Sequence, residues 1–341
     1  MNKLIYLATA VMALLSSVNA SSQQVAPTTS DSVATVYFIK EITPENLLKI
    51  YDALDRRALG KVCVKLSFDE SGNSNHLSPA LIAPLVQGLK ATLVECNTAY
   101  QSSRRHSSDH LKIAKEHGFT TIAPIDIMDN DGETALPVKG GKHLNLAYIG
   151  KNWLDYDFTI VLSHFKGHPS GGFGGALKNM AIGMQSSNGK AWVHTAGKNH
   201  DADNWWSDRA AQDDFLESMA ESSKAIIDHA GNHILYISVA NNLSVDCDCV
   251  AHPAPVQMAD IGIFASLDPV ALDRACVDAI HNSSDHGKIH MEQRIAERNG
   301  THLLDYAEHL GMFTFRHIDR FVVDVLFQGH TARRRVACGS G

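Results

Sequence analysis

Short apolar runs recur along the chain, and several carry few polar residues. The runs FTIVLS, from Phe158 to Ser163, and ILYISVA, from Ile234 to Ala240, are nearly continuous. Such runs are typical of strands buried on both faces, as in a parallel sheet. The same pattern predicts strands at Thr35–Ile39, Lys61–Phe68, Ala91–Cys96, Thr120–Ile125, Phe158–Ser163, Ile234–Ala240 and Ile261–Ala265.

Helical patterns lie between these runs. Ser78-Pro79 and Asp268-Pro269 each place a capping side chain before a proline at the first helical position. Further helices are predicted from Pro44 toward Ala58, from Ser108 to His117 and from Gln212 to Ala230. The alternation predicts an α/β fold, a mostly parallel sheet with helices on both faces.

The first 20 residues predict a cleavable secretory signal. Lys3 supplies the positive start, Leu4 to Val18 is uncharged and mostly apolar, and Ala20 ends a small-residue cleavage pattern. The apolar stretch is shorter than the roughly 20 residues of a membrane-spanning helix. We therefore expect an exported protein, periplasmic or extracellular, with no stable membrane insertion after cleavage.

The rest of the chain divides by composition. Residues 21–33 are rich in Ser, Gln, Thr and Pro, which predicts a disordered linker. The α/β domain is predicted at 34–311, with room for two lobes, 34–150 and 151–311, around one cleft. No internal sequence repeat follows the linker.

The composition limits the kinds of molecule that the protein is expected to bind. The net charge of -7 argues against nucleic acid and anionic membranes. The 19 His raise the prior for metal or acid/base chemistry without locating a site. The six Cys are too sparse for a disulfide scaffold, and Cys63, Cys96 and Cys276 are predicted to be core residues.

The densest polar segment is VLSHFKGHPSGGFGGALKNMAIG, from Val161 to Gly183. It begins at the carboxyl end of a predicted buried strand, where open α/β sheets bind their ligands. Its histidines are candidate acid/base groups, and its glycines and lysines suit an anionic ligand. The alternative is a glycine-rich packing turn with surface histidines, and no nucleotide-binding fingerprint is present. The predicted catalytic residues are His164, His168 and Lys178, and the predicted cofactor-binding residues are Lys166, Gly174, Gly175 and Asn179.

The sequence Asp246-Cys247-Asp248-Cys249 follows another predicted strand end. Two thiols one residue apart can bind one soft metal ion, form a reducible disulfide, or remain inert and buried. We predict Cys247 and Cys249 as metal ligands, with His194 as a third, since mixed Cys/His ligation suits zinc, nickel, copper or iron. His164 or His168 could complete the site instead, so each is either a ligand or an acid/base group. His194 alternates with Trp192, so both would project to one side if this stretch, inside the weakly patterned region 166–208, were extended.

Together these blocks resemble a known family. KLSF, VECNTAY, SHFKGH followed by GGALKN, GKAWVHTAG, DCDC and DIGIFASLDPVALDRACVD occur in the order typical of domain-of-unknown-function family 362, from about Thr35 to Gly311. The resemblance implies no settled activity. Many relatives carry a ferredoxin-like insertion after GGALKN, which associates the family with iron–sulfur chemistry. This chain lacks those cysteines, so an iron–sulfur cofactor would have no ferredoxin motif to hold it.

A weaker similarity is to the lactate racemase family, which uses a nickel-pincer nucleotide. That family also pairs histidines with a Gly-Gly-x-Lys-like turn. Here the turn from Gly174 to Lys178 is one residue longer, which puts the equivalence of Lys178 to a cofactor-linked lysine in question. The tail 312–341 departs from family 362, and no function is assigned to it.

The sequence therefore predicts an exported metal-dependent protein. The favoured interpretation is an enzyme that acts on a small anionic molecule with a Cys/His metal site. The alternatives are a non-enzymatic metal- or ligand-binding module and a thiol–disulfide redox protein that uses Cys247 and Cys249. Racemisation, another proton abstraction and redox chemistry would each use these groups.

Overall fold

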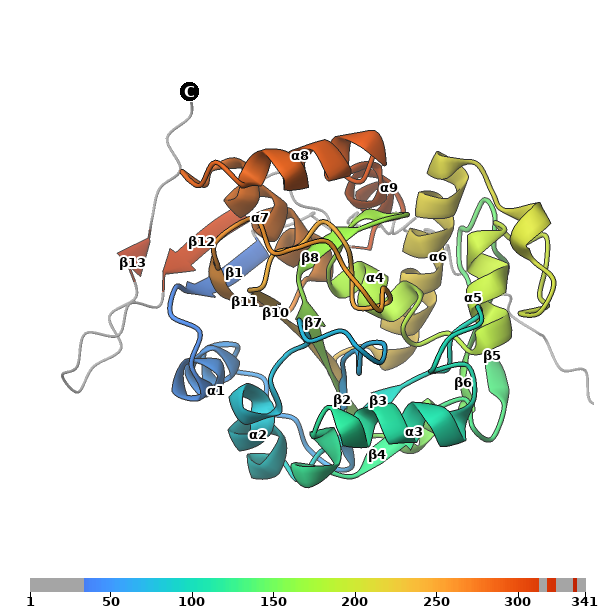
Figure 1. Cartoon of the computed structure of the whole chain (residues 1–341), viewed down its shortest axis with the longest axis horizontal. Coiled ribbons are helices and arrows are strands. Elements are labelled where there is room, and N and C mark those ends of the chain that lie inside the picture. Colours follow the sequence, from blue (N-terminus) through green and yellow to red (C-terminus); the bar gives the residue numbers. More distant parts are fainter. Residues whose placement is uncertain (1–33, 313–317, 323–333, 336–341) are drawn as a thin grey trace, which may run out of the picture. The chain divides into compact units, whose positions relative to one another are not determined.

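A central sheet has helices packed against both faces (Figure 1). The computed structural model describes residues 34–312, 318–322 and 334–335. The sheet order is β13-β12-β1-β11-β10-β7-β2-β3-β4. Its strands are β1 (Ala34–Ile39), β2 (Val62–Lys65), β3 (Thr92–Glu95), β4 (Ile125–Ile127), β7 (Phe158–His164), β10 (Ile234–Ala240), β11 (Gly262–Ser266), β12 (Ile318–Val322) and β13 (Arg334–Arg335).

The strands β10, β7, β2, β3 and β4 run parallel to one another. β11 is antiparallel to both of its neighbours, β10 and β1, so β1 points the same way as the parallel group. The predicted α/β fold with a mostly parallel sheet is therefore confirmed. Two small hairpins lie outside this sheet: β5 (Glu133–Pro137) with β6 (Leu146–Gly150), and β8 (Lys166–His168) with β9 (Gly172–Gly174).

Successive side chains along a strand point alternately into two apolar layers, one on each face of the sheet. Ile160 and Leu162 of β7 belong to the core layer that contains helices α1, α2 and α3, whereas Val161 belongs to the layer with α4, α6, α7, α8 and α9. This explains why β7 has almost no polar alternation. The helices are α1 (Pro44–Ala53), α2 (Pro79–Gly88), α3 (Ser107–Glu116), α4 (Ala176–Ala181), α5 (Ser187–His194), α6 (Gln212–Ala230), α7 (Pro269–His281), α8 (Lys288–Glu297) and α9 (His302–His309).

The predicted helix starts agree with the structure, but their caps differ. Asp268 accepts hydrogen bonds from the backbone N–H of Val270 and Ala271, as predicted for α7. Ser78 precedes α2 without a side-chain cap bond, so Pro79 alone marks that start. Cys63, Cys96 and Cys276 are buried, as expected.

Three local predictions were wrong. The predicted strand Thr120–Ile125 is a 3₁₀ turn at Phe119–Thr121 followed by β4. The region 166–208 is mostly regular, since it contains β8, β9, α4 and α5. Trp192 and His194 lie in helix α5, so their side chains do not project to one side. The apolar pattern did not predict these short elements, because they contain polar and glycine residues at tightly packed positions.

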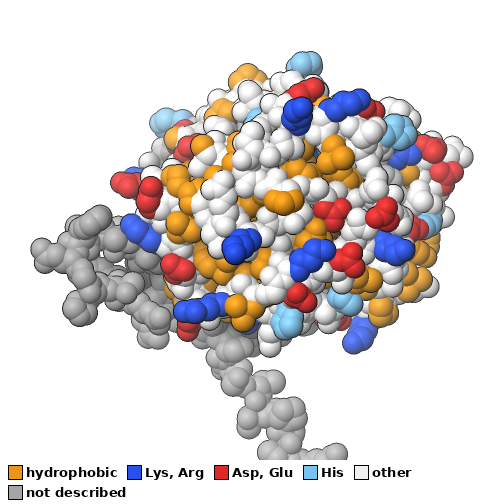
Figure 2. Space-filling view, turned by 90° about the horizontal axis from the view of Figure 1, so that it is seen from below, with side chains coloured by type: hydrophobic (Ala, Val, Ile, Leu, Met, Phe, Trp, Pro, Cys, Tyr) orange, Lys and Arg blue, Asp and Glu red, His pale blue; other side chains and the backbone are white. Residues whose placement is uncertain are grey.

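The predicted signal peptide and linker, 1–33, lie outside the described residues, as does most of the tail 312–341. Within the described part of the chain, no helix combines the length and apolarity needed to cross a membrane. The face in Figure 2 shows basic and acidic side chains interspersed among apolar ones.

Candidate functional site

The candidate site lies beyond the carboxyl ends of β7 and β10, which pair in parallel. The β8–β9 hairpin follows β7, and it packs against the segment after β10: Gly167 donates its N–H to the carbonyl of Ser244 at 2.9 Å. A Cβ on Gly167 would lie 2.4 Å from the Val245 carbonyl oxygen, so only glycine permits this approach. The contact brings the hairpin beside the loop that carries both cysteines.

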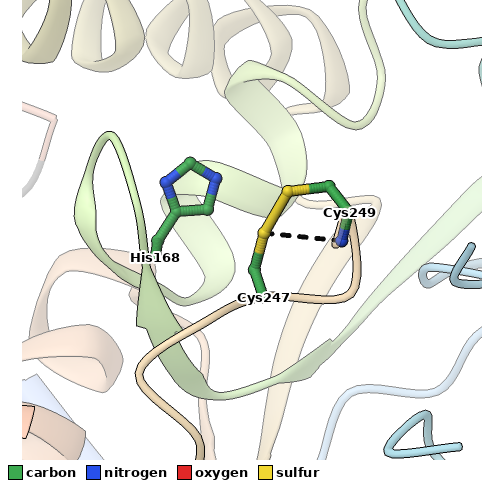
Figure 3. A group of neighbouring side chains, drawn as sticks. All are labelled: His168, Cys247 and Cys249. Atoms are coloured by element: carbon green, nitrogen blue, oxygen red, sulfur yellow. Dashed lines mark hydrogen bonds between the residues drawn. A yellow bond between two sulfur atoms is a disulfide. The ribbon is translucent and has the colours of Figure 1, made fainter. Parts of the chain in front are cut away.

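Cys247, Cys249 and His168 form a group of potential ligands whose donor atoms all lie within 4.8 Å of one another. The two sulfurs are joined as a disulfide, and the imidazole of His168 lies beside them with a ring nitrogen turned toward the sulfurs (Figure 3). The backbone N–H of Cys249 approaches the Cys247 sulfur at 3.4 Å. The structure thus brings together two predicted metal ligands and one predicted catalytic histidine.

Backbone contacts fix the tautomer of His168. Its Nδ1 accepts hydrogen bonds from the backbone N–H of Ser170 at 3.1 Å and Gly171 at 2.8 Å. Burial, aided by Lys178 and His194, holds its pKa well below the usual range, so the ring is neutral. A neutral ring with an accepting Nδ1 carries its proton on Nε2.

Asp248, between the two cysteines, contacts His164 and Lys166, which the sequence predicts as site residues. Lys166 forms a buried ion pair with the Asp248 carboxylate, and His164 Nδ1 lies 3.3 Å from the same oxygen. His164 donates its Nε2 proton to the Asn241 carbonyl at 2.7 Å. Burial and the Lys166 charge lower the pKa of His164 to about 3, and burial lowers the pKa of Lys166 to about 8.

Asp69 is a buried carboxylate that the sequence did not single out. It is 0% exposed, and neither oxygen has a hydrogen-bond partner among the described residues. Burial raises its pKa to about 7, although Lys166 and His164 oppose this effect. The next residue, Glu70, donates its N–H to the Asp248 carbonyl at 3.1 Å, which joins this loop to the cysteine segment.

A buried network of charged side chains lies at the same carboxyl-end edge of the sheet. Arg104 bridges Glu95 and Glu70, each at 3.0 Å, and Lys65 lies 4.0 Å from Glu95. His110 contacts the other oxygen of Glu95 at 3.1 Å. Lys65 and Glu95 end the neighbouring parallel strands β2 and β3. Arg104 and Glu70 gave no signal, because they lie in loops without a recognisable motif.

Lys178 of helix α4 is the site's uncompensated cation. It forms no ion pair with any described residue, and burial together with the charges of Lys65 and Arg104 lowers its pKa to about 7. Its amine therefore exchanges readily between the charged and neutral forms near neutral pH.

The other predicted cofactor-binding residues have structural contacts. The Asn179 side chain binds Lys65 Nζ and donates to the carbonyls of Lys65 and Leu162. A Cβ on Gly175 would overlap the Asp273 carboxylate, which accepts the first backbone N–H groups of α4. An anion at that helix start would meet a carboxylate already in place. Gly174 has no such close neighbour, since its Cβ would lie 3.8 Å from Lys178.

His194 does not join the sulfur group. Its ring stacks on Trp205 and Phe215, with centroids 4.9 and 4.6 Å apart, and burial lowers its pKa to about 3. A different ligand group, His143, Asp214 and Glu217, lies on other elements, and there Glu217 also accepts from Lys142 at 2.8 Å.

The solved structures that match the chain include two distant neighbours. A lactate racemase apoprotein from Thermoanaerobacterium thermosaccharolyticum has 12% identity and a TM-score of 0.37, and the match covers 60% of this chain and 50% of that one. A structural-genomics protein from Thermotoga maritima has 11% identity and a TM-score of 0.40, with 77% and 60% covered. This chain thus spans less than two thirds of either neighbour's length.

No curated protein matches the chain. A family model, "Domain of unknown function (DUF362)", matches residues 62–278, which is more than half of the chain and includes every candidate site residue named above from Lys65 to Asp273. The chain belongs to this family of unknown function, as its sequence blocks predicted.

Proposed function

We propose that Cys247, Cys249 and His168 bind one soft divalent metal ion when the cysteines are reduced. The observation that carries this proposal is the convergence of their donor atoms within 4.8 Å, from two separate segments at the carboxyl edge of the sheet. Two thiolates and one imidazole are the protein ligands of some catalytic zinc sites, which keep a fourth position open. Such an ion would supply Lewis-acid chemistry to a bound substrate.

The donor set fits a metal under two conditions. A ligating histidine usually donates its other ring N–H to an acceptor. Here Nδ1 accepts from Ser170 and Gly171, so binding through Nε2 requires its proton to leave and the turn to adjust. The described disulfide must also be reduced, since its sulfurs are bonded to each other.

The surrounding charges support an anionic substrate. Lys166 is neutralised by Asp248, and Arg104 by two carboxylates, whereas Lys178 forms no ion pair among the described residues and the Glu95 charge only partly offsets the effect of burial on its pKa. We propose Lys178 as the group that attracts a small anion or exchanges a proton with it. His164 is neutral at physiological pH because burial and the Lys166 charge lower its pKa.

A second candidate function is thiol–disulfide exchange without metal. The tautomer of His168 favours it, because the N–H on Nε2 faces the sulfurs and can donate a hydrogen bond to a leaving thiolate. The proposed signal peptide suits both functions, since export would place the cysteines where free thiols seldom persist.

Elemental analysis separates the two functions. The mature protein would be reduced anaerobically, loaded with zinc and desalted, beside Cys247→Ser/Cys249→Ser and the control Cys63→Ala, which removes a buried thiol outside the site. His143→Ala in each background removes the contribution of the other ligand group. The proposal expects about one zinc per chain that the double variant loses and the control keeps. Equal zinc in all variants, with a titratable disulfide, supports exchange chemistry instead.

A further inference from the structure

A cavity lies at the opposite end of the sheet from the cysteines. Its volume is about 370 Å³, and its lining includes Ala34 at the start of β1, Ile234 at the start of β10 and Ser266 at the end of β11. The cysteine loop follows the other end of β10. Six residue steps of about 3.3 Å separate Ile234 from Ala240, so the two sites lie about 20 Å apart.

Two buried polar groups in this cavity lack partners. The hydroxyl of Tyr236, whose side chain is 1% exposed, has no hydrogen bond within the described structure. Asp268 is 5% exposed; its Oδ1 caps α7, while its Oδ2 has no partner. Buried polar groups are almost always satisfied, so these two atoms indicate something that occupies the cavity.

Arg56 adds a charge of opposite sign to that of Asp268. It lines the same cavity, where one guanidinium nitrogen donates to the Ile234 carbonyl at 3.2 Å. No ion pair joins Arg56 to Asp268 or to any other acid in the described residues. The cavity is therefore lined by a basic and an acidic side chain that do not pair with each other, and by Tyr236, whose hydroxyl has no partner in the described structure. Burial raises the pKa of Asp268 to about 7, so its carboxyl is mostly ionised only above that pH.

We propose that this cavity binds a free amino acid, with its carboxylate on Arg56 and its ammonium on Asp268 Oδ2. A zwitterion matches both charges, and the Tyr236 hydroxyl can bind either end. The apolar lining of Leu54, Ile234 and Leu267 accommodates an aliphatic side chain. The volume falls within the range of small-molecule sites, roughly 300–1,000 Å³.

The Asp268→Asn and Tyr236→Phe variants suit a test because they spare the fold. Asp268→Asn retains the capping Oδ1 and replaces only the unpartnered oxygen, and Tyr236→Phe removes a hydroxyl that has no partner. If the hydroxyl is merely unsatisfied, Tyr236→Phe raises the melting temperature and leaves binding unchanged.

Calorimetric titration of the full chain with L-leucine is the experiment. The ammonium-lacking analogue 4-methylpentanoate and the carboxylate-lacking analogue isopentylamine should bind at least about tenfold more weakly, as should L-leucine to Asp268→Asn and Arg56→Gln, since each change removes a charge-assisted hydrogen bond. Cys247→Ser/Cys249→Ser should bind L-leucine normally, which separates this site from the proposed metal centre. No heat with L-leucine, L-alanine or L-serine at millimolar concentration, or unchanged affinity in Asp268→Asn, overturns the proposal.

Discussion

Gly167→Ala should disrupt the contact that assembles the candidate site. The new Cβ would lie 2.4 to 2.5 Å from the Val245 carbonyl oxygen, carbonyl carbon and Cα. All three are backbone atoms, so no side chain can rotate away, and the hairpin must shift from the cysteine loop.

The magnitude follows from two opposing effects. Overpacking in a buried contact costs about 1–3 kcal/mol. Replacing glycine also reduces the entropy of the unfolded chain, which returns about 0.4–1 kcal/mol. The net loss in the free energy of unfolding should be about 1–2 kcal/mol, a fall in melting temperature of roughly 2–5 °C for a chain of this size.

The matched control is Gly174→Ala in the partner strand of the same hairpin. Its Cβ would meet only Lys178 Cδ at 3.8 Å, an ordinary contact. Thermal unfolding followed by circular dichroism, together with the rate at which a phosphine reduces the disulfide, measures both variants. Gly167→Ala should melt lower and be reduced at a changed rate, whereas Gly174→Ala should match the parent within about 1 °C. Equal melting temperatures for the two variants would refute the steric argument.

Two further changes test the buried charges. Arg104→Ala should lower the free energy of unfolding by about 3–5 kcal/mol, because it leaves the buried Glu70 without a cation and Glu95 with only the more distant Lys65. Arg105→Ala, which loses an ion pair with the exposed Asp203, should cost at most about 1 kcal/mol. Similar losses for the two variants in urea titrations would contradict this reasoning. Asp69→Asn should stabilise the protein at high pH: burial raises the pKa of Asp69 to about 7 in the folded state, so the wild type loses stability as the pH rises from about 4 toward 7 while the variant does not. The difference at pH 8 should be on the order of 2–4 kcal/mol, and a difference independent of pH would disprove it.

The parallel sheet could be predicted because its signal is local. β7 and β10 are continuous apolar runs buried on both faces, and Asp268-Pro269 carries its own helix start. The 3₁₀ turn at Phe119–Thr121 and helix α5 could not be predicted, since so short a stretch of mixed apolar and polar residues fits a helical period of about 3.6 or a strand period of about 2.

The sequence located candidate site residues where strand ends and motifs coincide. Cys247, Cys249 and His168 meet because β7 and β10 are neighbours, which the strand-end rule implies without giving the pairing. His194 was assigned to the metal although aromatic rings enclose it, a contact between α5 and residues 11 and 21 positions further along the chain. Asp69 and Arg104 are defined by tertiary burial alone, which no single-sequence pattern reports.

The central claim is that the reduced cysteines hold a metal ion. Cobalt titration of the anaerobically reduced protein tests it most directly, because thiolate–cobalt coordination gives a charge-transfer absorption. We expect that absorption to saturate at one cobalt per chain, to disappear on oxidation to the disulfide, and to be absent from Cys247→Ser/Cys249→Ser. Two additional titratable thiols after reduction, with no charge-transfer absorption at any cobalt concentration, would contradict the claim.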